Sequence, residues 1–137
     1  MGALRRDVGP AVLGFSSPSG PGGLVEPGAD IVIERVIQRG LFRGERLEIH
    51  PSSAKAFDMQ SGHAGLEPLF EGMEPVCLAV FPSVTAGAGV RFKFASRVMP
   101  LHMGTLQTGG VIKMTLRNVS DAPARFRANL IGVRSES

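Results

Sequence analysis

Apolar and polar residues alternate most regularly in the last quarter of the chain, where residues 111–133 read as two strands around a polar turn. The first strand has one apolar and one polar face, with Ile112, Met114 and Leu116 opposite Lys113, Thr115 and Arg117. The second repeats the pattern, with Phe126, Ala128 and Leu130 opposite Arg125, Arg127 and Asn129. Because side chains alternate across a strand with a period of two, the pattern predicts a hairpin with one buried face and one basic face.

Shorter apolar or alternating runs precede this hairpin, separated by glycine and proline. They predict strands over residues 30–39, 46–50, 75–81 and 90–98, a turn over 40–44 and one helical turn over 51–58. Residues 59–74 could hold a short edge strand within a long loop. Six or more short strands, with no long segment of 3.6-residue period, predict an all-β chain folded as an antiparallel β-sandwich over residues 30–137.

Residues 1–29 differ from the rest because eleven of these 29 positions are glycine or proline. Such a segment cannot hold a helix or a central strand, and we expect it to be mobile in the free protein. It nevertheless carries apolar residues that a plain linker would not need, namely Val12, Leu13, Phe15, Leu24 and Val25. We therefore expect an extended arm over residues 1–29 that orders against another subunit, with these residues as anchors. An inert leader is the alternative.

The composition limits the class of protein. The 137 residues are enough for one core, and eight Phe with no Trp or Tyr suit a core better than a wet binding site. The net charge of +3 is far below that of a dedicated DNA-binding domain, yet it is compatible with docking on an acidic protein shell. The single Cys77 cannot form an internal disulfide, and no apolar run approaches the ~20 residues of a membrane span. We expect a soluble protein made in a reducing cytoplasm.

Residue types that carry chemistry do not form a recognisable motif. Three histidines stand apart from other ligands, without the H-x-H or C-x-x-C spacing that begins a metal site: His50, His63 and His102. Three glutamates could in principle supply an acid–base pair, although loop glutamates are usually just solvated: Glu67, Glu71 and Glu74. The sequence also lacks a nucleophile elbow and a phosphate-binding loop. We expect no catalytic residue, no cofactor and no metal, and hence no enzyme.

Basic residues fall on the outward side of three predicted strands: Arg91, Lys93, Lys113, Arg117, Arg125 and Arg127. If these strands share a sheet, its outward side is a positive surface suited to an acidic partner, since complementary charge orients docking. A merely solvated face is the alternative. Nucleic acid fits this surface less well, because single-strand binders expose aromatic rings for stacking, whereas Phe92, Phe94 and Phe126 are expected to point inward.

A Gly/Pro-rich arm leading into a compact β-sandwich without an active site resembles the small jelly-roll decoration (cement) proteins that bind the capsid lattice of tailed bacteriophages. The segments behind the resemblance are residues 1–29, 37–47 and 111–133, the last with its turn at 118–123. The resemblance implies a jelly-roll-like sandwich, a place in the virion, a trimer or dimer, and the major capsid protein or another shell protein as partner.

Two other functions remain open at this point. One is a β-sandwich module that binds carbohydrate or another small ligand, as a receptor-binding tip does; sugar sites favour Trp and Tyr, which this chain lacks. The other is a single jelly-roll capsid subunit that forms the shell itself.

Overall fold

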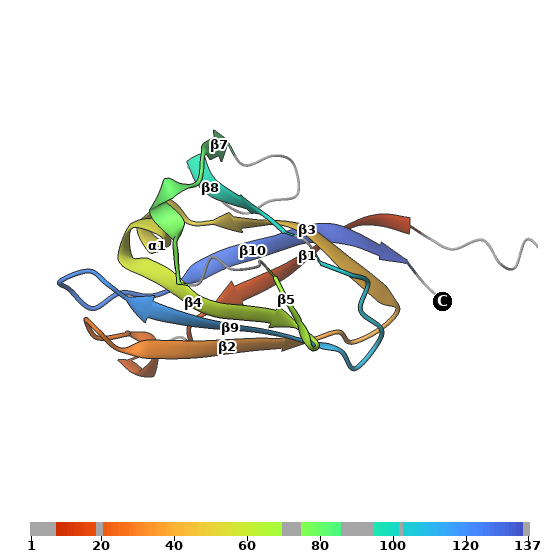
Figure 1. The fold of residues 1–137 in the computed structure, drawn as a ribbon, viewed down its shortest axis with the longest axis horizontal. Coiled ribbons are helices and arrows are strands. Elements are labelled where there is room, and N and C mark those ends of the chain that lie inside the picture. The colour runs from red at the N-terminus through yellow and green to blue at the C-terminus, as the bar shows by residue number, and fades with distance from the viewer. Residues whose placement is uncertain (1–7, 19–20, 70–74, 86–94, 102, 136–137) are drawn as a thin grey trace, which may run out of the picture.

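The computed structural model describes residues 8–18, 21–69, 75–85, 95–101 and 103–135, which form two antiparallel sheets packed together (Figure 1). One sheet contains β1 (Val8–Ser16), β3 (Leu41–Ile49), β7 (Ser83–Thr85), β8 (Ala95–Pro100) and β10 (Arg127–Ser135). The other contains β2 (Asp30–Val36), β4 (Phe57–Ala64), β5 (Glu67–Pro68), β6 (Val76–Cys77) and β9 (Val111–Asn118). Short helices lie between strands at η2 (Pro21–Gly23), α1 (Pro51–Ala56) and η3 (Leu78–Val80). The predicted all-β sandwich is confirmed.

The strand order is that of a jelly roll. The first sheet, here called the β10 sheet, runs β1-β10-β3-β8-β7, and the second, the β9 sheet, runs β2-β9-β4-β5 with β6 also beside β4. Four antiparallel pairs nest within one another, namely β1 with β10, β2 with β9, β3 with β8, and β4 with β5. The chain therefore behaves as one long hairpin wound over itself, so that its beginning and end pair with each other.

The core between the sheets contains the residues that the alternating pattern assigns to it. All six apolar residues predicted to point inward in the last quarter are buried: Ile112, Met114, Leu116, Phe126, Ala128 and Leu130. Phe126 meets Phe57 of β4 edge to face, with ring centroids 5.5 Å apart and ring planes at 84°. Edge-to-face packing brings the positive rim of one ring to the negative face of the other, which adds to the gain from burial.

The hairpin predicted over residues 111–133 is wrong in its pairing. β9 pairs with β2 and β4, whereas β10 pairs with β1 and β3, so the two strands belong to different sheets. The buried Asn118 fixes the crossing between them. Its amide nitrogen lies 2.7 Å from the carbonyl oxygen of Val25 and 2.8 Å from that of Ala122, and its Oδ1 accepts from the backbone N–H of Ser120. With both donors and the acceptor satisfied inside the protein, this amide holds the 118–126 connection in place.

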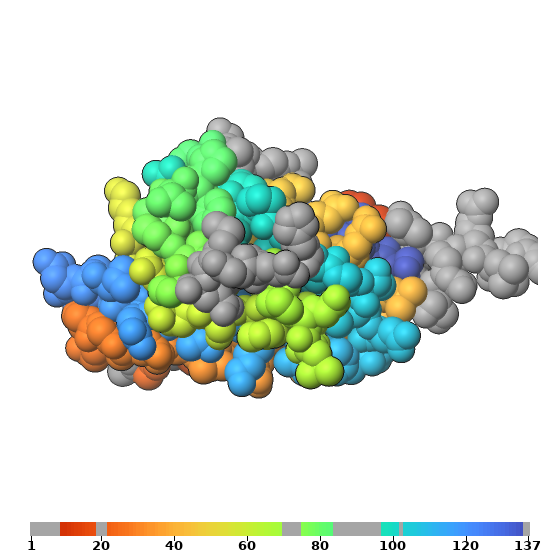
Figure 2. All heavy atoms as spheres, in the orientation of Figure 1, coloured from red at the N-terminus to blue at the C-terminus, as the bar shows by residue number. Residues whose placement is uncertain are grey.

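Residues 8–18 and 21–29 are also built into the sandwich, so the arm boundary predicted at residue 30 is corrected. β1 lies beside β10 (Figure 1), and all nine of its residues pair with that strand. Phe15 is completely buried. Val25 is buried too and bridges to Ala124; Figure 2 shows the 118–126 connection, in blue, beside residues 21–29, in orange. Glycine and proline are tolerated because β1 is an edge strand, where a missing N–H on the outer side breaks no ladder hydrogen bond. Residues 1–7 lie outside the described residues.

Several shorter predictions have mixed outcomes. The helical turn over 51–58 is confirmed as α1, and residues 59–74 contain most of β4 and all of β5. Residues 41–44 are not a turn but the start of β3. The apolar run 75–81 forms only a two-residue strand followed by η3. The strand predicted over 90–98 is described only from residue 95, where β8 begins.

The integration of β1 predicts a large effect of Phe15→Ala. Removing this buried ring leaves a cavity between the sheets and should lower the free energy of unfolding by about 3–5 kcal/mol in urea denaturation. The matched control is Val12→Ala on the opposite face of the same strand, where the side chain is 42% exposed and the loss should stay below about 1 kcal/mol. Equal, small effects of the two substitutions would mean that residues 8–16 are an arm after all.

Candidate functional site

A cleft opens along one side of the sandwich, between β1 and the segment that joins β2 to β3. It has a volume of about 320 Å³ and is lined by residues 10–13 of β1, residues 35–39, Phe42 and Arg134. We call it the edge cleft. It lies here because β1 and β2 are edge strands of different sheets, and no ladder of hydrogen bonds between described residues joins them.

The segment after β2 forms a fixed wall of the edge cleft. Ile37 and Phe42 are both buried, at 3% and 2% exposure, and anchor this wall in the core. The backbone N–H of Ile37 donates to the carbonyl of Gly110, and the N–H of Gly109 donates back to the carbonyl of Ile37. Gly40 completes the turn with φ at 73°, a left-handed conformation that glycine adopts without strain.

Arg35 links the two walls. Its Nη1 donates to the carbonyl oxygen of Gly14 over 2.7 Å and so connects β2 of one sheet to β1 of the other. A hydrogen bond from a charged donor is stronger than one between neutral groups, and arginine is suited to this position because its guanidinium stays protonated at any physiological pH. Arg35 therefore fixes the width of the edge cleft at this point.

The edge cleft is basic and partly apolar. Arg35, Arg39 and Arg134 line it, and within the described ranges no carboxylate is among its lining residues. A concave surface with charges of one sign concentrates the electrostatic potential and attracts ligands of the opposite sign. Val12 and Val36 add apolar area, since both are more than 40% exposed. The buried position of this turn belongs to Ile37, next to Val36.

The five predicted arm anchors lie in three different environments. Val12 and Leu13 line the edge cleft, so this pair does lie at a candidate binding site. Phe15 and Val25 are buried within the chain's own core and cannot anchor it to another subunit while the domain is folded. Leu24 remains 43% exposed, next to the bridge between Val25 and Ala124.

The predicted basic face does not form as one surface. Lys113 and Arg117 lie on the outward side of the β9 sheet, whereas Arg125 and Arg127 lead into β10 in the other sheet. Arg125 contributes to the structure itself, because its Nη1 donates to the carbonyl of Pro18 over 2.7 Å. Arg91 and Lys93 lie outside the described residues.

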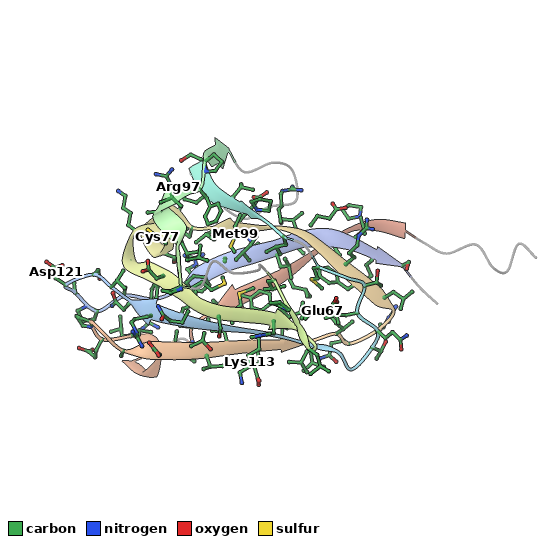
Figure 3. The ribbon with its side chains drawn as sticks, viewed as in Figure 1. Glu67, Cys77, Arg97, Met99, Lys113 and Asp121 are labelled. Atoms are coloured by element: carbon green, nitrogen blue, oxygen red, sulfur yellow. The ribbon has the colours of Figure 1, made fainter. Side chains whose placement is uncertain are left out.

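Carboxylates on the neighbouring strand β2 lie opposite the two basic residues of β9. Arg117 forms a two-pronged pair with Asp30 of β2, with Nε 2.7 Å from Oδ1 and Nη2 3.3 Å from Oδ2. The hydrogen bond from Arg117, helped by its positive charge, lowers the pKa of Asp30. Lys113 pairs in register with Glu34 and points away from the sandwich in Figure 3. Opposite charges on paired strands stabilise the sheet and leave this face mixed rather than positive.

The residue types for metal binding or acid–base chemistry do not gather in the described ranges, where no group of three or more His, Cys, Asp or Glu is close enough to hold a metal. His50 precedes α1, and its Nδ1 accepts from the backbone N–H of Ser52 over 3.3 Å. Burial lowers the pKa of His50, and the charge of Arg127 lowers it further, which keeps the ring neutral and able to accept. His63 pairs in register with Lys113. His102, Glu71 and Glu74 lie outside the described residues.

Comparison with other proteins adds no assignment: no protein-family model, curated protein or solved structure matches this chain. Among the helices of the described residues, none is long and apolar enough to span a bilayer.

The three arginines of the edge cleft were absent from the sequence-based prediction. Arg35 and Arg39 flank the turn after β2, and Arg134 stands near the end of β10, far away in the sequence. No local pattern connects them. The only available signal was that Arg35 interrupts the apolar alternation just before Val36 and Ile37.

The ion pair between Asp30 and Arg117 predicts a specific titration. In an NMR titration of the side-chain carboxyls, Asp30 should have a pKa below its ordinary value, and Arg117→Gln should restore that value. Because the folded-state pKa is the lower one, the pair stabilises the fold above about pH 4 and loses this contribution as the pH falls through the folded pKa. Lys113→Gln, on the same strand, is the control and should leave the titration of Asp30 unchanged. If it shifts Asp30 as much as Arg117→Gln does, the direct pair is not the cause.

Proposed function

We propose that this protein is a structural virion protein of the decoration type, which binds a phage capsid shell and stabilises it. The observation that carries the proposal is the edge cleft, an arginine-lined concave site with apolar walls on a jelly-roll sandwich. The major capsid protein, or another shell protein with an acidic surface segment, is the proposed partner. A homo-oligomer, trimer or dimer, at the symmetry positions of the shell is part of the same proposal.

The residue types in the edge cleft support binding rather than turnover. Guanidinium groups remain charged at physiological pH and offer a fixed fork of N–H donors to carboxylates, so they hold a ligand without exchanging protons with it. Valine, isoleucine and phenylalanine contribute only apolar area. The function therefore proposed is recognition of an acidic protein surface, with no enzymatic step.

The fold supports the proposal in a weaker way. Jelly rolls occur in capsid proteins, but also in lectins and cupins, so the architecture alone does not decide between functions. The position of the cleft is more informative, because it lies at the side of the sandwich and leaves both outward sheet faces available to other contacts. A protein that binds only the assembled shell stabilises it by mass action, and oligomers that dock at several points gain further through avidity.

A module that binds a small anionic ligand is the second candidate. The cleft volume of about 320 Å³ falls at the lower end of the range for small-molecule sites. The same three arginines would then bind a carboxylated sugar or another small acid. The two candidates predict different saturable binding partners for the protein. A decoration protein binds an assembled shell, whereas a small-ligand module binds a soluble acid.

Shell binding by charge variants tests the proposal. Mixed with undecorated capsids of the cognate phage, the wild-type protein should co-sediment with assembled shells and not with dissociated subunits. Arg39→Gln should weaken binding about tenfold, because a charge-assisted contact in the cleft is lost. Arg127→Gln removes the same charge from an exposed site outside the cleft and should have little effect.

Raising the salt concentration should weaken the wild type more than Arg39→Gln, since exposed charges are screened. Equal losses in both variants would contradict docking through the cleft. An absence of shell binding, together with saturable binding of an acidic sugar, would favour the second candidate.

A further inference from the structure

We propose that the outer face of the β9 sheet binds a second copy of this chain, related to the first by a two-fold axis that runs along the strands between β2 and β9. This dimer is the oligomer that the proposed function includes, and only its role at a shell rests on that function. The contact itself depends on the charges and the exposure of this sheet face, and it can be tested without a shell.

The outer face of the β9 sheet carries three rows of side chains across β2 and β9. In each row a residue of β2 stands opposite a residue of β9: Glu34 with Lys113, Val32 with Thr115, and Asp30 with Arg117. Their neighbours Ile33 and Met114 are buried in the core, so these side chains point outward. Val32 is 51% exposed, and Lys113 points away from the sandwich (Figure 3). Covering the central valine would remove apolar area from water, which favours association.

The charged residues of this face form two columns of opposite sign. β2 contributes the carboxylates Asp30 and Glu34, whereas β9 contributes the cations Lys113 and Arg117. Asp30 and Arg117 satisfy each other within one copy through their two-pronged pair. Glu34 and Lys113 stand in register, but neither has an ion-pair partner among the described residues. Their charges are therefore available to a second copy.

The two columns determine which two-fold axis suits the charges. An axis along the strands places β2 of each copy over β9 of the other, so Glu34 of one copy faces Lys113 of the other at two equivalent contacts. An axis across the strands would place β2 over β2 and β9 over β9, and like charges would meet. A partner of one charge sign would be repelled by one of the columns. Charge complementarity therefore selects a second copy, in a closed isologous dimer.

The ordinary dimensions of packed sheets allow these contacts. Sheets pack ~10 Å apart, a gap that the long side chains of Glu34 and Lys113 can bridge. Aligned sheets cross at about 30°, and these residues stand only two positions from the central row of Val32 and Thr115. The crossing displaces them by roughly 3–4 Å, which is less than the spacing between neighbouring strands. The opposed charges consequently stay within reach of each other.

Charge reversal in the full-length protein tests this dimer by analytical ultracentrifugation. The wild type should show a reversible equilibrium between monomer and dimer. Glu34→Lys and Lys113→Glu each place like charges at both contacts and should weaken dimerisation about tenfold or more. When the two variants are mixed, opposite charges meet at both contacts, and a heterodimer should form with about the wild-type affinity. This rescue cannot come from improved folding, because each copy keeps its own substitution.

Glu26→Lys and Lys55→Glu are the matched controls. They change the net charge in the same way at exposed positions outside this face, in the turn before β2 and in α1. Each should change the dimer affinity less than about twofold, since isolated surface charges contribute little. Circular dichroism melting curves verify that every variant is folded.

The inference is overturned if the wild type remains a monomer at every concentration, if each reversal alone dimerises like the wild type, if the controls weaken the dimer equally, or if the mixed reversals fail to associate. A dimer that responds as expected but does not co-sediment with shells would support this face and reject the proposed shell function. Shell binding by a protein that stays monomeric would support the shell function and reject this dimer.

Discussion

The pairing of β1 with β10 is the constraint on which the rest of the structure depends. It joins the first described residues to the last along nine register positions, from Val8 opposite Ser135 to Ser16 opposite Arg127. This pairing places Phe15 in the core, and no other strand of the described residues pairs with β1. The same interaction thus completes the sandwich and creates the edge beside which the cleft lies.

Two polar contacts outside the strand ladders help to fix how the two sheets meet. The side-chain amide of Asn118 donates to two backbone carbonyls and so fixes the connection between the β9 sheet and the β10 sheet. Arg35 connects β2 to β1 by a hydrogen bond to the carbonyl of Gly14. Neither contact belongs to a strand ladder. Because unsatisfied polar groups are costly inside a protein, the contacts of the buried Asn118 are specific in a way that apolar packing is not. The cleft is consequently a preformed site whose width the fold itself sets.

The sequence was sufficient to assign the buried face of β9, but it did not identify strand partners. Ile112, Met114 and Leu116 alternate with polar residues, and burial follows this local pattern directly. Whether β9 pairs with β10 or with β2 depends on contacts distant in the sequence, and the hairpin prediction failed for that reason. The glycine and proline content of residues 8–16 suggested an arm, because proline is excluded from central strands. That prediction was wrong because proline is tolerated on the outer side of an edge strand. Arg35, Arg39 and Arg134 meet only through the jelly-roll topology, so no local motif could have predicted the site.

Amide hydrogen exchange along residues 11–15 of the free protein tests this account most directly. If β1 is the edge strand described here, the amides of Ala11, Leu13 and Phe15 exchange slowly because they donate to β10, while those of Val12 and Gly14 exchange fast at the open edge. This alternation is the expected result. Uniformly fast exchange over residues 11–15 would contradict this account. The segment would then be an arm, and β1 would not form one side of the edge cleft.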